Sequence, residues 1–183
     1  AEGGAVLMMK RVRIGQLMEQ GMLLVGFVLL NGVSGDTVAG QKSEALAPLT
    51  TLSLGADQLD LQNYRGKVVL LDFWASWCGP CRQSFPWMNL VYEKYKDQGF
   101  AIIAINLDQE KKAAAGFLAA VPAFFKILYD PVGSSAEQMA VMGMPMSYLI
   151  DRKGHVSHRL IGFNSAKKKE HEAHIIALLN EAI

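Results

Sequence analysis

Apolar residues follow two different spacings between residues 67 and 107. Residues 67–73 (KVVLLDF) and 100–107 (FAIIAINL) are nearly continuous apolar runs, which is typical of strands buried on both faces of a sheet. The segment between them, residues 79–97, has apolar residues at helical spacing: Phe85, Met88, Val91, Tyr92 and Tyr95. A strand, a helix and a strand in this order predict a parallel βαβ unit with a right-handed crossover.

The pattern after residue 107 predicts further helices and a hairpin. The predicted segments are a helix over 109–120, a short helix over 134–142, and antiparallel strands over 146–150 and 156–161 joined by a turn at 151–155. Ser165 is placed to cap a last helix that ends near Glu181. We expect four apolar residues on its buried side: Ile175, Ile176, Leu178 and Leu179. Residues 47–183 are therefore interpreted as one α/β domain.

The first 31 residues have the order of a secretory signal. Basic residues at 10, 11 and 13 precede the apolar run 22–30 (MLLVGFVLL), and small and polar residues follow over 31–40. We expect residues 1–31 to form a signal peptide or signal-anchor, or alternatively a hydrophobic helix used for self-association. Residues 32–46 are predicted to be a linker.

Composition narrows the possible functions. The chain has 183 residues, 51% of them hydrophobic, and a mean hydropathy of +0.17, which argues against global disorder. Its net charge of +1 does not indicate a nucleic-acid partner. Two cysteines exclude both a disulfide-dense scaffold and a four-cysteine zinc site.

The two cysteines lie where the first predicted strand ends and the predicted helix begins. Cys78 would lie at the helix N-terminus, where unpaired N–H groups and the helix dipole stabilise a thiolate. Cys81 is one turn further on, and Pro80 is tolerated in the first turn. We expect Cys78 to be the nucleophile and Cys81 the resolving thiol. An inert buried pair or half of a zinc site fits this placement less well.

The segment around the cysteines, residues 72–82 (DFWASWCGPCR), resembles the active site of the thioredoxin superfamily. Residues 64–70 (YRGKVVL), Phe85-Pro86, residues 143–145 (GMP) and residues 149–154 (LIDRKG) resemble its TlpA/ResA-like branch of bacterial extracytoplasmic thiol-disulfide oxidoreductases. The resemblance implies a thioredoxin fold, in which helices flank a central mixed β-sheet, here preceded by an N-terminal hydrophobic helical segment.

The resemblance also implies how the site works. It implies dithiol–disulfide exchange through a mixed disulfide, with the Cys78–Cys81 disulfide as the redox group and no other cofactor or metal. It implies a cis peptide bond before Pro145, facing Cys78, whose backbone would pair with an extended substrate strand. The residues expected to bind substrate are Trp77, Gly79, Pro80, Met144 and Pro145.

Asp72 is a carboxylate inside an apolar strand, and burial should raise its pKa. The matching acid of thioredoxins relays the proton of the second cysteine, so the resemblance implies that role here; the alternative is an internal hydrogen-bonding acid. Two positions depart from the pattern. Ala104 stands where thioredoxins carry a lysine near this acid, and Ser84 stands where many ResA-like proteins carry a glutamate.

These features together favour an extracytoplasmic, periplasmic reductant of protein disulfides, with apocytochrome c among its candidate substrates. The resemblance implies a membrane thiol-electron transporter as donor. Alternative functions are an oxidase, an isomerase that oligomerises through residues 1–30, or a Cu(I) metallochaperone. The last would use the two cysteines and one of four methionines expected around Pro145: Met139, Met142, Met144 and Met146. His171 and His174 are expected to face solvent.

Overall fold

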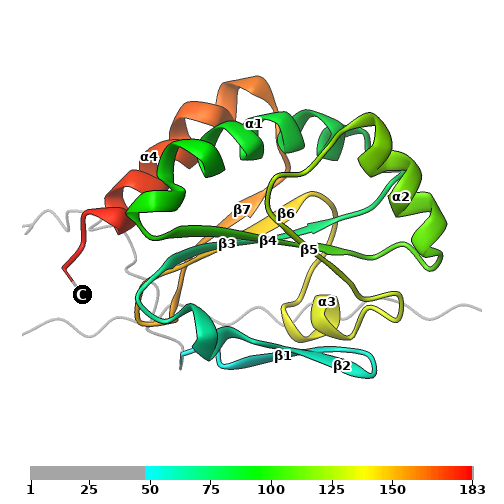
Figure 1. Cartoon of the computed structure of the whole chain (residues 1–183), viewed down its shortest axis with the longest axis horizontal. Helices are drawn as coiled ribbons and strands as arrows, with labels where there is room; N and C mark the ends of the chain where they lie inside the picture. The colour runs from blue at the N-terminus through cyan, green and yellow to red at the C-terminus, as the bar shows by residue number, and fades with distance from the viewer. Residues whose placement is uncertain (1–47, 183) are drawn as a thin grey trace, which may run out of the picture. The chain divides into compact units, whose positions relative to one another are not determined.

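A five-stranded mixed sheet forms the centre of the computed structural model, which describes residues 48–182 (Figure 1). The strand order is β5-β4-β3-β6-β7. The strands are β3 (Val68–Trp74), β4 (Phe100–Asn106), β5 (Lys126–Tyr129), β6 (Met146–Ile150) and β7 (Val156–Ile161). β3, β4 and β5 run parallel, whereas β6 pairs antiparallel with β3 and β7 antiparallel with β6. A separate two-stranded hairpin consists of β1 (Thr51–Leu54) and β2 (Asp57–Asp60).

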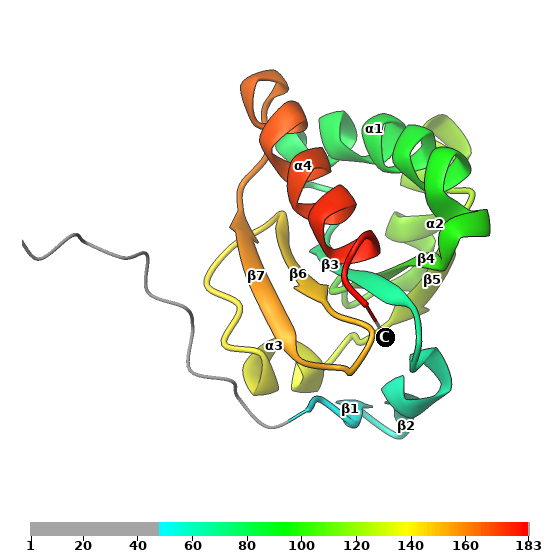
Figure 2. The same cartoon turned by 90° about the vertical axis from the view of Figure 1, so that its left-hand side faces the viewer.

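Helices and the hairpin cover the two faces of the sheet. The helices are α1 (Gly79–Tyr95), α2 (Lys111–Ala120), α3 (Ser134–Gln138) and α4 (Lys168–Leu179). α1 and α4 lie side by side on one face, where Glu172 of α4 accepts hydrogen bonds from Lys94 and Tyr95 of α1 (Figures 1 and 2). α3 and the β1–β2 hairpin lie against the opposite face. The predicted mixed sheet flanked by helices is therefore confirmed.

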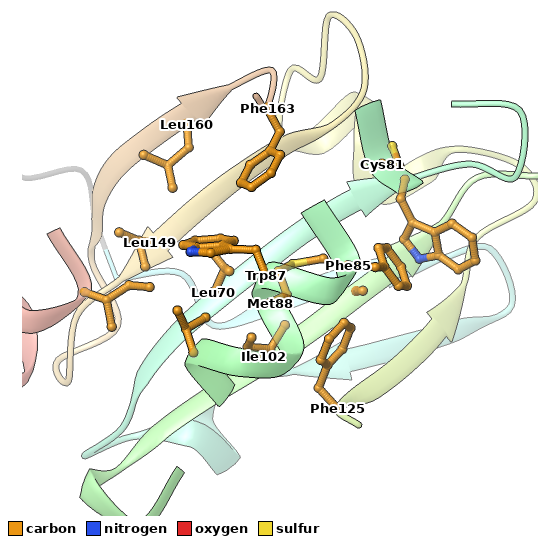
Figure 3. Packing of buried hydrophobic residues seen from close by; sticks show 14 of the residues in the cluster. Leu70, Cys81, Phe85, Trp87, Met88, Ile102, Phe125, Leu149, Leu160 and Phe163 are labelled. Carbon is orange, nitrogen blue, oxygen red and sulfur yellow. The ribbon is translucent and has the colours of Figure 1, made fainter. Parts of the chain in front are cut away.

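The alternation of β3 divides the core into two layers. Leu70 and Trp74 point into the cluster beneath α1, and Leu71 and Phe73 point into the cluster beneath the hairpin and α3. Figure 3 shows Phe85 and Met88 of α1 directed toward the strands. All seven residues of β3 are buried, which explains the continuous apolar run read from the sequence. Asp72 is the one charged residue of β3. Because side chains alternate along the strand, it lies on the α1 face, as Leu70 and Trp74 do.

The observed elements differ from the predicted ones mainly at short or terminal segments. β5 and the β1–β2 hairpin were not predicted; each of these strands has only four residues, and their pairing depends on distant partners. The helix predicted over 109–120 begins at Lys111. Asn164, and not Ser165, caps the last helical region, because its Oδ1 accepts hydrogen bonds from the N–H groups of Ala166 and Lys167.

Two predictions about side-chain exposure on α4 are wrong. Ile176 was expected to be buried, yet it is 39% exposed, whereas Ile175 and Leu178 are buried as expected. His171 was expected to face solvent, yet it is buried and its ring packs against Trp87 and Phe163. α4 presents one narrow stripe to the sheet, and His171 lies on that stripe four residues before Ile175.

The predicted signal, anchor or association segment over 1–31 and most of the predicted linker lie outside the described residues. Within residues 48–182, no helix has the length and apolar character needed to cross a membrane.

Candidate functional site

Cys78 and Cys81 form a disulfide at the junction between β3 and α1, with their Cα atoms 5.3 Å apart. Cys78 is the N-cap residue of α1, and its Sγ accepts a hydrogen bond of 3.2 Å from the N–H of Cys81. Pro80 occupies the first turn, where its missing N–H costs no helical hydrogen bond. A sulfur that already accepts an N–H bond at a helix N-terminus is in a position that favours a thiolate after reduction.

The two sulfurs differ in their surroundings. Cys81 is fully buried in the cluster beneath α1, whereas Cys78 retains a small exposed fraction of 4%. Gly79 and Pro80 between them are exposed. Trp77, directly before Cys78, is 73% exposed, whereas Trp74 is fully buried against Phe85. A partner molecule would therefore reach the Cys78 side of the disulfide beside an exposed indole ring.

Asp72 is buried on β3, between Ala104 of β4 and Ser147 of β6 in the strand register. Its Oδ1 accepts a hydrogen bond of 2.6 Å from the Ser147 hydroxyl, while its buried Oδ2 has no partner within the described part of the chain. Burial raises the pKa of Asp72 to about 7, and the Ser147 hydrogen bond opposes that rise. The carboxyl group can therefore gain or lose a proton near neutral pH.

The Met144–Pro145 peptide bond is cis, as expected. Pro145 is buried and directly precedes β6, whose first residue, Met146, pairs with Phe73 near the end of β3. This register brings the cis bond to the same edge of the sheet from which the chain leads to Cys78. Met144 is half-buried and packs against the cluster that contains both cysteines.

The four methionines near Pro145 do not form one group. Met139 and Met146 are buried in the cluster beneath α3 and the hairpin, on the other face of the sheet from the cysteines. Met142 is 79% exposed, and only Met144 contacts the cysteine cluster. A soft sulfur site for Cu(I) beside the two thiols is not favoured by this arrangement.

The two residues that depart from the thioredoxin pattern, Ala104 and Ser84, both lie close to the site residues. Ala104 pairs with Asp72 across β3 and β4, so no ammonium group stands at that register position. Ser84 is buried, and its hydroxyl donates a hydrogen bond of 3.1 Å to the carbonyl oxygen of Cys81. Ser147 instead supplies the polar contact to Asp72.

Sequence reasoning missed three polar residues that shape this site: Ser147, Asn106 and Asp108. Asn106 ends β4 and is fully buried, and Asp108 follows it and contacts the loop before Cys78. The available signal was that Asn106 lies at the end of a buried strand and Asp108 just beyond it, since the carboxyl ends of parallel strands share one edge of a sheet. Nothing in the local sequence indicates that Ser147 pairs with Asp72.

Three features of this site occur together. A Cys-x-x-Cys disulfide begins a helix after a central strand, a cis-proline lies at the same sheet edge, and that strand carries a buried acid. Together they define the class of thiol-disulfide oxidoreductases with a thioredoxin fold.

Comparison with known proteins agrees with this class. The family model described as Redoxin matches residues 38–175, so the chain belongs to the Redoxin family. It is 32% identical to the thiol-disulfide oxidoreductase ResA of Bacillus cereus over 146 residues, covering 80% of this chain and 84% of the relative. It is also 32% identical to the thioredoxin-like protein YneN of Bacillus subtilis over 155 residues, covering 81% of this chain and 90% of the relative.

Solved structures give the same result. A crystal structure of a candidate thiol:disulfide interchange protein DsbE from Chlorobium tepidum has a TM-score of 0.68 and 46% sequence identity, covering 76% of this chain and 98% of that one. The chain is thus a thiol-disulfide oxidoreductase.

Proposed function

We propose that this protein works outside the cytoplasm as a reductant of protein disulfides, with Cys78 as the attacking thiol, Cys81 as the resolving thiol and Asp72 as the proton relay. The observation that carries the proposal is the capping position of Cys78, whose Sγ accepts the Cys81 N–H at the start of α1. A thiolate stabilised at this position would be both a good nucleophile at neutral pH and accessible from the Trp77 side.

The proposed reaction has two exchange steps. The Cys78 thiolate attacks one sulfur of a substrate disulfide, which forms a mixed disulfide and releases the first substrate thiolate. Cys81 then loses its proton to Asp72 and attacks the Cys78 sulfur, which closes the Cys78–Cys81 disulfide and releases the second substrate thiolate. The substrate gains two electrons, and this protein loses them. Asp72 then passes the Cys81 proton to one substrate thiolate, and the other substrate thiolate takes its proton from water.

The pKa of Asp72 supports its part in the second step. A carboxyl group that titrates near pH 7 can accept a thiol proton and release it again, which a carboxylate with an ordinary pKa does poorly. Asp72 lies on the α1 face of β3, between Leu70 and Trp74 of the cluster that contains Cys81. We propose that Trp77, Gly79, Pro80, Met144 and Pro145 form the substrate-binding surface around the disulfide.

The compartment and the electron donor are inferred from the sequence. The basic residues and the apolar run 22–30 have the order of an export signal or anchor. A reductant in an oxidising compartment must be reduced again after each turnover, so we propose a membrane thiol-electron transporter as its donor. The cysteines of apocytochrome c are a candidate substrate.

The reduction potential tests the direction of electron flow. The full chain is equilibrated in glutathione buffers, and Trp fluorescence follows the redox state, because Trp77 directly precedes Cys78; a Cys81→Ser variant, which cannot close the disulfide, is the control. We expect a potential near or below about −250 mV, as for thioredoxin-like reductants. A value of about −120 to −180 mV would identify an oxidase or isomerase and overturn the proposed direction.

A further inference from the structure

A buried carboxylate clamps the loop that leads into Cys78. Asp108 is 6% exposed and lies just beyond the end of β4. Its Oδ2 accepts a 2.9 Å hydrogen bond from the backbone N–H of Ser76, and its Oδ1 accepts a 3.0 Å hydrogen bond from the Ser76 hydroxyl. The backbone N–H and the hydroxyl of Ser76 therefore both donate to one side chain that is 32 residues away in the chain.

The carboxylate of Asp108 is itself held in place. Its Oδ2 also accepts a 2.8 Å hydrogen bond from Nδ2 of Asn106, a fully buried side chain. In return, the N–H of Asp108 donates a 3.1 Å hydrogen bond to Oδ1 of Asn106. Asn106 and Asp108 thus form a closed pair that fixes where the carboxylate points.

The clamped loop has little other freedom. Residues 75–77 connect β3 to the cap of α1, and the Cys78 N–H donates a 3.1 Å hydrogen bond to the carbonyl oxygen of Ala75. Just before the loop, the carbonyl oxygen of Trp74 accepts a 2.9 Å hydrogen bond from the Leu107 N–H. Ser76 lies between the residues that form these two backbone hydrogen bonds, and its own N–H and hydroxyl are bound by Asp108.

We infer that Asp108 is a positioning residue for thiol-disulfide exchange: by holding Ser76, it keeps the Cys78 sulfur at the N-cap of α1. The inference rests on the proposal that Cys78 is the attacking thiol. The N-terminus of a helix stabilises a thiolate only while the sulfur stays within the first turn. Releasing the loop should therefore raise the pKa of the Cys78 thiol and slow its reactions at neutral pH.

The charge of Asp108 acts in the opposite direction, which makes the inference testable. An anion near Cys78 disfavours a second anion, so removing the charge alone should lower the pKa of the Cys78 thiol or leave it unchanged. Asp108→Asn removes the charge but can keep the clamp: its amide oxygen can accept from the Ser76 and Asn106 N–H groups, and its amide NH₂ can donate to the Ser76 hydroxyl. Asp108→Ala removes the charge and the clamp together.

Asp130 offers a matched control. It is fully buried, and its carboxylate accepts three hydrogen bonds, from the Gly133 N–H and from the N–H and hydroxyl of Ser135. Gly133 and Ser135 lie at the start of α3, so the Asp130 carboxylate holds a different segment from the loop that precedes Cys78. The Asp130 backbone N–H donates a 2.9 Å hydrogen bond to the carbonyl oxygen of Asn106, and alanine keeps this bond. Asp130→Ala therefore removes an equally buried carboxylate without releasing Ser76.

The test is the pH dependence of iodoacetamide alkylation at Cys78, read by mass spectrometry in the reduced full chain. We expect Asp108→Ala to raise the pKa of Cys78 by about 0.5 to 1 unit, which makes the thiolate fraction roughly three- to tenfold smaller at pH values below the wild-type pKa of Cys78. Asp108→Asn and Asp130→Ala should show no rise. Ser76→Ala, which loses only the hydroxyl bond, should show a smaller rise, and it decides the question if Asp108→Ala does not fold.

Other outcomes would overturn the inference. Equal pKa values for Cys78 in Asp108→Ala and Asp108→Asn would mean that the carboxylate acts only by its charge, or not at all. An equal rise in Asp130→Ala would mean that general loss of stability, and not the clamp, moves the thiol. A wild-type protein in which Cys81 is alkylated faster than Cys78 would instead overturn the proposed roles of the two cysteines.

Discussion

Replacing Asp72 with asparagine should change how stability depends on pH. In the folded, oxidised protein the carboxyl group of Asp72 has a pKa of about 7, against 3.8 for the unburied group. The unfolded chain therefore releases this proton at a lower pH than the folded chain does. The contribution of Asp72 to stability is therefore highest below about pH 4, falls as the pH rises toward 7, and is lost above about pH 7.

The size of the effect follows from the two pKa values. A difference of about 3 pKa units at about 1.4 kcal/mol per unit corresponds to about 4 kcal/mol between pH 4 and pH 8. Asparagine has no proton to lose, so the stability of Asp72→Asn relative to wild type should increase by about this amount over that range. The unpaired amide NH₂ adds a constant cost, which shifts the curve without changing its slope.

The assay is urea unfolding of the oxidised full chain, followed by Trp fluorescence at several pH values from 4 to 8. Asp97→Asn, which removes an exposed carboxylate, is the control and should leave the pH profile of the wild type unchanged. If the wild-type and Asp72→Asn profiles are parallel, so that their difference changes by less than about 1 kcal/mol, then burial does not hold the proton on Asp72 and the reasoning is refuted.

Three further predictions concern the surrounding residues. Ser147→Ala removes the hydrogen bond that lowers the pKa of Asp72, so the step in the pH profile should move up by about one unit; an unmoved step would show that the hydroxyl does not act on Asp72. Phe85→Ala should cost about 3 to 5 kcal/mol in urea unfolding, because its ring packs against three aromatic rings, whereas Leu90→Ala on the exposed side of the same helix should cost at most about 0.5 kcal/mol. Burial lowers the pKa of His171, so the folded state keeps it neutral while the unfolded chain takes up a proton; wild-type stability relative to His171→Phe should fall as the pH drops below about 6.5, and a constant difference would contradict this.

The sequence alone determined the features that depend on local periodicity. The two buried strands, the helix between them and the hairpin near the end were predicted to within a few residues, because continuous apolar runs and helical spacing report burial directly. The position of Cys78 at a helix N-terminus followed from the same pattern. The placement of Gly79 and Pro80 in the first turn of this helix was likewise predicted from the sequence.

Only the tertiary structure decided which residues from different strands meet. Ser147 contacts Asp72 because β6 pairs with β3 in one particular register, and a shift of one residue would turn Ser147 to the other face. Asp108 reaches Ser76 because parallel strands bring their carboxyl ends to one edge. His171 shares a helical stripe with Ile175, but only the packing of α4 against Trp87 of α1 shows that the imidazole is buried. Spacing along the chain encodes which side of an element is apolar, but the partners of buried polar groups depend on packing between distant segments, and those contacts set the chemistry of this site.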